Sequence, residues 1–115
     1  MEIVDFSNLN TLSGGDNQYF TDVINIFIDS TSKSIEKLKQ LAPNDDNHLE
    51  VSGVAHSIKS GVGIVQVVGM LDELIHVEKL AKNIEHMDEA REHLQKVISI
   101  FENALPILEK EKKRK

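Results

Sequence analysis

The residues best suited to chemistry are a histidine and a lysine three positions apart, His56 and Lys59. If residues 48–66 form a helix, one side of it is apolar and contains Val51, Val54, Ala55, Ile58, Val62 and Val65. At ~100° per residue, His56 lies roughly 150° from the centre of that stripe and should face solvent. Lys59 is the only Lys or Arg between Lys39 and Lys79. An exposed imidazole with one cation a turn away indicates a docking site for an anionic group.

The surface around His56 is predicted to carry almost no side chains. Its other members are Ser52, Gly53, Ser60 and Gly63. Each glycine costs ~1 kcal/mol relative to alanine in a helix interior, so a purely structural helix would gain by replacing both. Missing side chains allow another molecule to come close. We therefore expect these four residues to form a partner-docking surface, while an inert solvated helix face stays open as the alternative.

Four amphipathic segments can position this site. Apolar residues recur every three or four positions over residues 16–42, 48–66, 67–84 and 88–108. Asp16 suits a helix N-cap, residues 43–47 form a loop, and Pro106 should kink or end the last helix. No strand-like alternation is present. The sequence predicts an all-α fold, an antiparallel four-helix bundle with a short N-terminal capping segment in residues 1–15.

Composition excludes several classes of protein. The 115 residues are enough for one domain, and 40% are hydrophobic, which is typical of a folded soluble protein. The absence of cysteine excludes disulfides, zinc fingers and thiol catalysis. Residues 109–115 form a basic tail; without it 8 basic and 17 acidic residues remain, a charge of −9. We expect no nucleic-acid partner for the body, no membrane contact, a cytoplasmic location and a monomer.

Two rival sites find little support. A di-metal carboxylate bundle needs two Glu-x-x-His pairs, and Glu73 with His76 is the only one. We therefore predict no metal site. Nucleotide binding by residues 61–63 lacks both a preceding strand and the phosphate-binding lysine motif. Two functions remain open. One is a transient covalent reaction on an exposed histidine, and the other is a helical bundle that acts as an adaptor by binding a partner.

The segment Ala55-His56-Ser57-Ile58-Lys59 resembles the Ala-His-x-Leu-Lys motif of the histidine-containing phosphotransfer (HPt) domains of bacterial phosphorelays. The likeness extends over nearly the whole chain: residues 14–16 and the Phe27 region resemble the family's opening helices. Val77-Glu78 resembles the family's Leu-Glu or Ile-Gln pair on the next helix. The resemblance implies a phosphocarrier domain, not an enzyme, free-standing or part of a hybrid kinase.

The resemblance also implies roles for single residues. His56 would accept a phosphoryl group from a receiver-domain aspartate and return it to another receiver, Lys59 would balance the phosphate charge, and Glu78 would orient the site. The partners would be response-regulator receiver domains. No cofactor is expected on this domain, because Mg²⁺ would belong to the receiver. The chemistry is plausible independently of the resemblance, because an unperturbed imidazole has a pKa of ~6.5 and is a competent nucleophile near neutral pH.

Two residues depart from the family pattern. Members usually carry glycine where this chain has Ser60 and Gln66. Serine is small enough to keep the approach to His56 open. Gln66 is expected to alter the bend into the following helix or the choice of partner. The alternative function is a non-phosphorylated adaptor that binds a partner protein, for which we expect a large exposed apolar patch.

Overall fold

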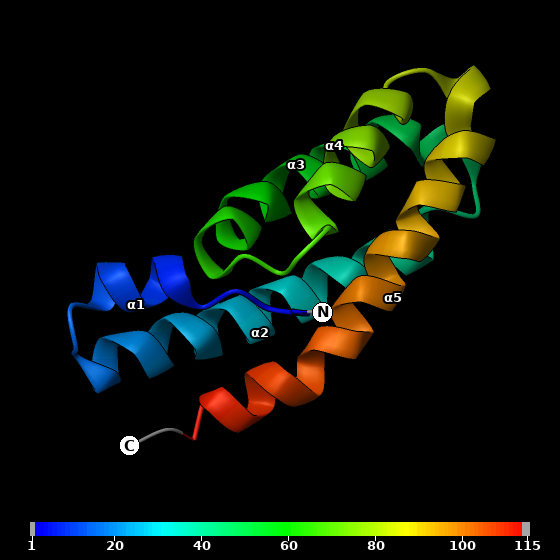
Figure 1. Ribbon diagram of the computed structural model, residues 1–115. Coiled ribbons are helices and arrows are strands. Elements are labelled where there is room, and N and C mark those ends of the chain that lie inside the picture. The colour runs from blue at the N-terminus through cyan, green and yellow to red at the C-terminus, as the bar shows by residue number, and fades with distance from the viewer. Residues whose placement is uncertain (1, 114–115) are drawn as a thin grey trace.

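The computed structural model describes residues 2–113, and over them the chain is helical with no strand beyond one isolated bridge. The elements are α1 (Ser7–Ser13), α2 (Asn17–Leu41), η1 (Asp45–Asn47), α3 (His48–Val65), α4 (Met70–Leu80), η2 (Ile84–His86) and α5 (Met87–Glu111). Helices α2 to α5 form the bundle, and α1 lies at one end beside the start of α2 (Figure 1). The predicted all-α bundle with a short N-terminal segment is confirmed.

The core forms because each long helix buries one apolar stripe. In α2 this stripe contains Phe20, Ile24, Phe27, Thr31, Ile35 and Leu38. Helix α2 contacts α3 and α5, and α4 also contacts α3 and α5. Phe27 packs edge-on against Phe101 of α5, with ring centroids 6.2 Å apart. A Cβ at Gly61 would lie 3.2 Å from the Phe27 ring, so this glycine lets α3 approach α2 closely.

The third predicted helix is shorter than expected. Val67 pairs in an isolated antiparallel bridge with Val4, and α4 begins only at Met70. The reason is Gly69, whose φ of 84° is left-handed and separates the bridge from the helix. Ile84 is not part of the core: it lies in η2 and is exposed. Its match to the helical spacing is a coincidence of sequence.

The N-terminal segment, which was predicted to cap one end of the bundle, forms hydrogen bonds with the end of α3. Asp5 N–H donates to the carbonyl of Gln66 at 2.9 Å, and Val68 N–H donates to that of Ile3 at 2.9 Å. The side-chain amide of Asn8 donates to the carbonyl of Ile64 at 3.0 Å. The bonds to Gln66 and Ile64 supply donors for carbonyls that a helix C-terminus leaves unpaired. The end of the helix that carries His56 is therefore held by the first residues of the chain.

Pro106 lies inside α5 and does not end it, since the helix continues to Glu111. Figure 1 shows the last part of α5 turning away from its earlier direction, the kink expected where a proline removes a hydrogen bond. Of the predicted basic tail, residues 109–111 are therefore helical, and Arg114 and Lys115 lie outside the described residues. Between residues 2 and 113, no helix has the length and apolar character needed to span a membrane.

Gln66 ends α3 in a left-handed conformation, with φ 60° and ψ 66°. Its N–H donates to the carbonyl of Val62 at 2.7 Å, the usual closing bond of such a C-cap. A side chain in this conformation costs ~1–2 kcal/mol, which a glycine avoids. Glycine would therefore be favoured at this position.

We predict that Gln66→Gly stabilises the protein by about 1 kcal/mol, because glycine adopts the left-handed conformation without that cost. Thermal or urea unfolding measures the change. Gln66→Ala is the control: it removes the side chain beyond Cβ but keeps the Cβ itself, so it should give no such gain. Equal stabilisation by both variants would contradict the explanation.

Candidate functional site

Three charged or titratable side chains meet where α3 packs against α4. His56 Nδ1 lies 2.8 Å from Oε1 of Glu78, and Lys59 Nζ lies 2.9 Å from the same oxygen. The exposed fraction falls from 71% for the His56 side chain to 27% for Lys59 and 16% for Glu78. The structure therefore brings together the three residues predicted to act at the site, and it leaves the imidazole open to solvent.

The contacts determine which nitrogen of His56 is available. Two hydrogen bonds lower the pKa of Glu78 below its usual 4.5: the one from Lys59 has the larger effect and the one from His56 the smaller. The carboxyl is therefore ionised at neutral pH. An ionised carboxylate only accepts hydrogen bonds, so Nδ1 of His56 is the donor. In a neutral imidazole the other nitrogen, Nε2, then carries the lone pair. When the imidazole is neutral, its lone pair is therefore on Nε2, on a side chain that is open to solvent.

The predicted docking residues divide into two groups. Gly53 and Ser60 are exposed, and Gly63 is half-buried. A Cβ at Gly53 or Gly63 would meet no atom within 4 Å, so packing within the fold does not require either glycine. The placement of Ser52 on the exposed face is wrong. It is 5% exposed, and its hydroxyl donates to the carbonyl of Glu78 at 2.7 Å, because α4 covers this side of α3.

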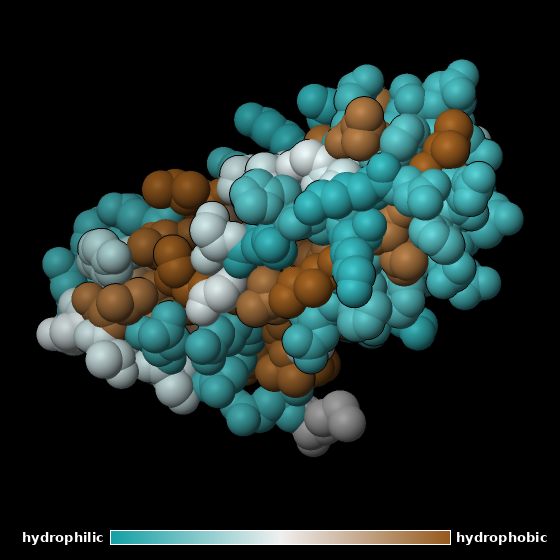
Figure 2. All heavy atoms as spheres, turned by 90° about the horizontal axis from the view of Figure 1, so that it is seen from above, coloured by the Kyte–Doolittle hydropathy of each residue, from teal (hydrophilic) through white to brown (hydrophobic). Residues whose placement is uncertain are grey.

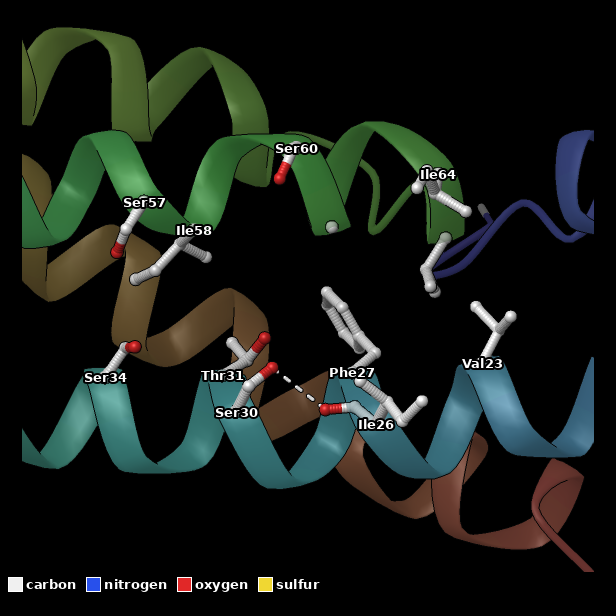
Figure 3. A pocket seen from close by; sticks show the side chains of 12 residues that line it. Val23, Ile26, Phe27, Ser30, Thr31, Ser34, Ser57, Ile58, Ser60 and Ile64 are labelled. Atoms are coloured by element: carbon white, nitrogen blue, oxygen red, sulfur yellow. Dashed lines mark hydrogen bonds between the residues drawn. The ribbon is translucent and has the colours of Figure 1, made fainter.

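An apolar groove of about 510 Å³ lies on the other side of His56, between α2 and α3. Figure 3 shows it lined from α2 by Val23, Ile26, Phe27, Ser30, Thr31 and Ser34, and from α3 by Ser57, Ile58, Ser60 and Ile64. Ser60 belongs both to this groove and to the surface predicted around His56. The imidazole therefore stands between a charged flank formed with α4 and an apolar flank formed with α2.

The α2 side of this groove was missed by reasoning from the sequence. A signal was present: Ile26 lies outside the buried stripe of α2 and is 66% exposed. Ile64 is likewise outside the stripe of α3 and exposed. Viewed over α3 and α4, apolar surface gathers toward the end of the molecule near α1, and the opposite end is mostly hydrophilic (Figure 2).

The other histidines make structural contacts. His48 Nδ1 donates to the carbonyl of Ala81 at 2.8 Å. His93 Nδ1 lies 2.6 Å from Glu73, and its ring stacks on that of His76 with centroids 4.6 Å apart. Glu73 and His76, the one Glu-x-x-His pair of the sequence, thus face α5. Over the described range 2–113, no cluster of three His, Cys, Asp or Glu side chains is arranged to hold a metal ion.

We predict that Lys59→Met raises the pKa of Glu78 back toward 4.5, because the largest cause of its depression is lost. The depressed pKa means that these contacts stabilise the fold above pH 4.5 and lose this effect as the pH falls through the folded value. A ¹³C titration of the Glu78 carboxyl measures the shift.

Lys96→Met, a change at an exposed lysine of α5, is the control and should leave Glu78 unchanged. At neutral pH the stability cost of Lys59→Met should be within ~1 kcal/mol, as for partly exposed ion pairs, since methionine keeps the apolar stem. An unchanged Glu78 pKa together with a large loss of stability would show that Lys59 is structural.

No protein-family model, curated protein or solved structure matches this chain.

Proposed function

We propose that this protein is a cytoplasmic phosphocarrier that accepts a phosphoryl group on Nε2 of His56 from the aspartyl phosphate of a receiver domain and passes it to another receiver. The observation that supports this most is the exposed imidazole whose Nδ1 donates to an ionised carboxylate. That arrangement leaves the Nε2 lone pair free. The resemblance of residues 55–59 to the HPt motif supports the same conclusion.

The reaction needs little from the carrier. The Nε2 lone pair forms a bond to phosphorus while the bond between phosphorus and the aspartyl oxygen breaks, and the aspartate leaves as a carboxylate. The proton on Nδ1 stays in place, so the positive charge that develops on the ring is balanced by Glu78. Phosphoryl transfer depends mainly on positioning and on electrostatic stabilisation. Lys59, which shares Glu78 with His56, supplies a cation for the phosphoryl oxygens.

The surface around His56 suits the docking of a receiver. Gly53, Ser60 and Gly63 let its backbone come close to the imidazole, and the groove between α2 and α3 accepts apolar side chains from the same partner. Mg²⁺ would be held by the receiver's own acidic pocket, so the carrier needs no cofactor. We propose that it works as a monomer.

A second candidate function is supported by the same groove. Ile26 is highly exposed at its edge, and an exposed apolar surface is typical of a site that binds another protein. A non-phosphorylated adaptor could use this surface without any chemistry at His56. Covalent labelling of the histidine separates the two functions.

We predict that phosphorylated receiver domains label this protein on His56 and on no other histidine. Nε2 is free and exposed at this residue, whereas His48 is tied to the neighbouring helix. Incubation with a panel of ³²P-labelled receivers should give a phosphoramidate that is labile in acid and stable in base. His56→Gln should abolish labelling, and His86→Gln, a change at another exposed histidine, should not. Label that persists in His56→Gln would refute the assignment.

A further prediction concerns Gly63, two turns from His56 on the same face of α3. Gly63→Leu should stabilise the protein slightly, by under ~1 kcal/mol, because leucine has the higher helix propensity and a Cβ meets no neighbour. The same side chain should slow transfer by about tenfold, since overpacking a contact surface costs ~1–3 kcal/mol. Melting temperature and transfer rate are measured on one sample.

Gln95→Leu, on the exposed face of α5, is the matched control for an added leucine and should leave transfer unchanged. Transfer at the wild-type rate in Gly63→Leu would mean that this face is not a docking surface.

A further inference from the structure

One edge of α3 makes three hydrogen bonds to the end of α4. His48 Nδ1 donates to the carbonyl of Ala81 at 2.8 Å, and Ser52 Oγ donates to the carbonyl of Glu78 at 2.7 Å. His56 Nδ1 donates to the carboxylate of Glu78 at 2.8 Å. Residues 48, 52 and 56 are spaced by four, so they lie one above another on the same side of the helix. Glu78 is thus held at both its backbone and its side chain.

The bond from Ser52 has a clear physical cause. Helix α4 ends at Leu80, so the carbonyl of Glu78 is among the last four and lacks the usual donor from its own helix. Ser52 is 5% exposed, and its hydroxyl takes that place. Serine within a helix often bonds its own backbone instead, as Ser57 does with the carbonyl of Val54. The hydroxyl of Ser52 points across to α4.

We infer that Ser52 is a positioning residue for His56: by holding the backbone of Glu78 at the end of α4, it keeps the Glu78 carboxylate on Nδ1 and thereby keeps the lone pair on Nε2. This inference rests on the proposed function, because the position of the lone pair matters only if His56 reacts. Helix ends fray, and α4 has only 11 residues. Without the hydroxyl, the last turn of α4 is free to move and the carboxylate spends less time on the imidazole.

Ser52→Ala tests this directly. Alanine favours a helix more than serine does, so α3 should still form. Ring ¹⁵N resonances of unphosphorylated His56 report which nitrogen carries the proton, and they should shift toward the tautomer protonated on Nε2. The second measurement is the rate at which free phosphoramidate labels His56. The Nε2 lone pair forms a bond to phosphorus while the P–N bond of the nitrogen-protonated donor breaks. Neutral ammonia leaves and takes up a proton from water. This rate should fall about two- to tenfold, the range expected for one lost hydrogen bond.

Two further variants separate positioning from plain stability. Ser52→Thr keeps a hydroxyl and should restore both the tautomer and the rate. Thr21→Val removes another buried hydroxyl, one that bonds within α2 at 3.2 Å, and should leave the His56 ring unchanged even if it lowers the melting temperature. If Ser52→Ala lowers the melting temperature but keeps the wild-type tautomer and labelling rate, Ser52 is only a cap of α4 and the inference is wrong.

Neither measurement uses a receiver domain, so the two proposals can fail separately. If no receiver labels the wild-type protein while Ser52→Ala still shifts the His56 tautomer, the proposed function fails and the positioning by Ser52 stands. If receivers label the wild-type protein but Ser52→Ala is indistinguishable from it in tautomer and rate, the positioning fails and the proposed function stands.

Discussion

The Glu78 carboxylate is the point on which the site depends. Its oxygens lie within hydrogen-bond distance of both His56 and Lys59, and it is mostly shielded from water. A partly buried anion requires partners, and here they are a ring nitrogen and an ammonium from the neighbouring helix. The same contact that satisfies the carboxylate also orients the imidazole and places a cation next to it. One interaction between α3 and α4 therefore sets position, protonation and local charge together.

The rest of the bundle keeps α3 and α4 in register for that contact. Contacts from Asp5 and Asn8 hold the last turn of α3, and Gly61, about one turn before that end, allows α3 to pack closely on Phe27 of α2. Because α3 is held along its length and at its C-terminal end, α4 can be short and still meet it at a defined place. The geometry of the site therefore depends on the packing of the whole bundle and not on α3 alone.

In the proposed carrier, the two flanks of His56 would serve different purposes, one for chemistry and one for recognition of the partner. On the α4 side, Glu78 would balance the positive charge on the ring and Lys59 the negative charge of the phosphoryl oxygens. On the α2 side, the groove and Ser60 form a surface with little charge. A carrier must give up its phosphoryl group as readily as it takes it, so extensive catalytic machinery of its own would bring no advantage. The sparse site agrees with this requirement, since a partner that supplies metal and acid needs only an accessible, correctly protonated imidazole.

Much of this could be predicted from the residues alone. Apolar spacing determined the four helical segments and the all-α class, and angular position on α3 predicted that His56 would be exposed. Both follow from local geometry, because a helix repeats every 3.6 residues whatever surrounds it. The same reasoning wrongly predicted that Ser52 is exposed. Its angular position on α3 places it at the edge of the apolar stripe but carries no information about α4, which covers it.

What only the tertiary structure decided involves residues that are distant in sequence. The hydrogen bonds that Glu78 accepts from His56 and from Ser52 span 22 and 26 positions in the sequence. The groove is likewise formed by residues of both α2 and α3. The late start of α4, at Met70, likewise depends on Gly69 and on the bridge between Val4 and Val67. Periodicity within one helix carries no information on how far a neighbour slides or rotates against it. That relative placement is set by side-chain packing across the whole core, and it decides which nitrogen of His56 is free.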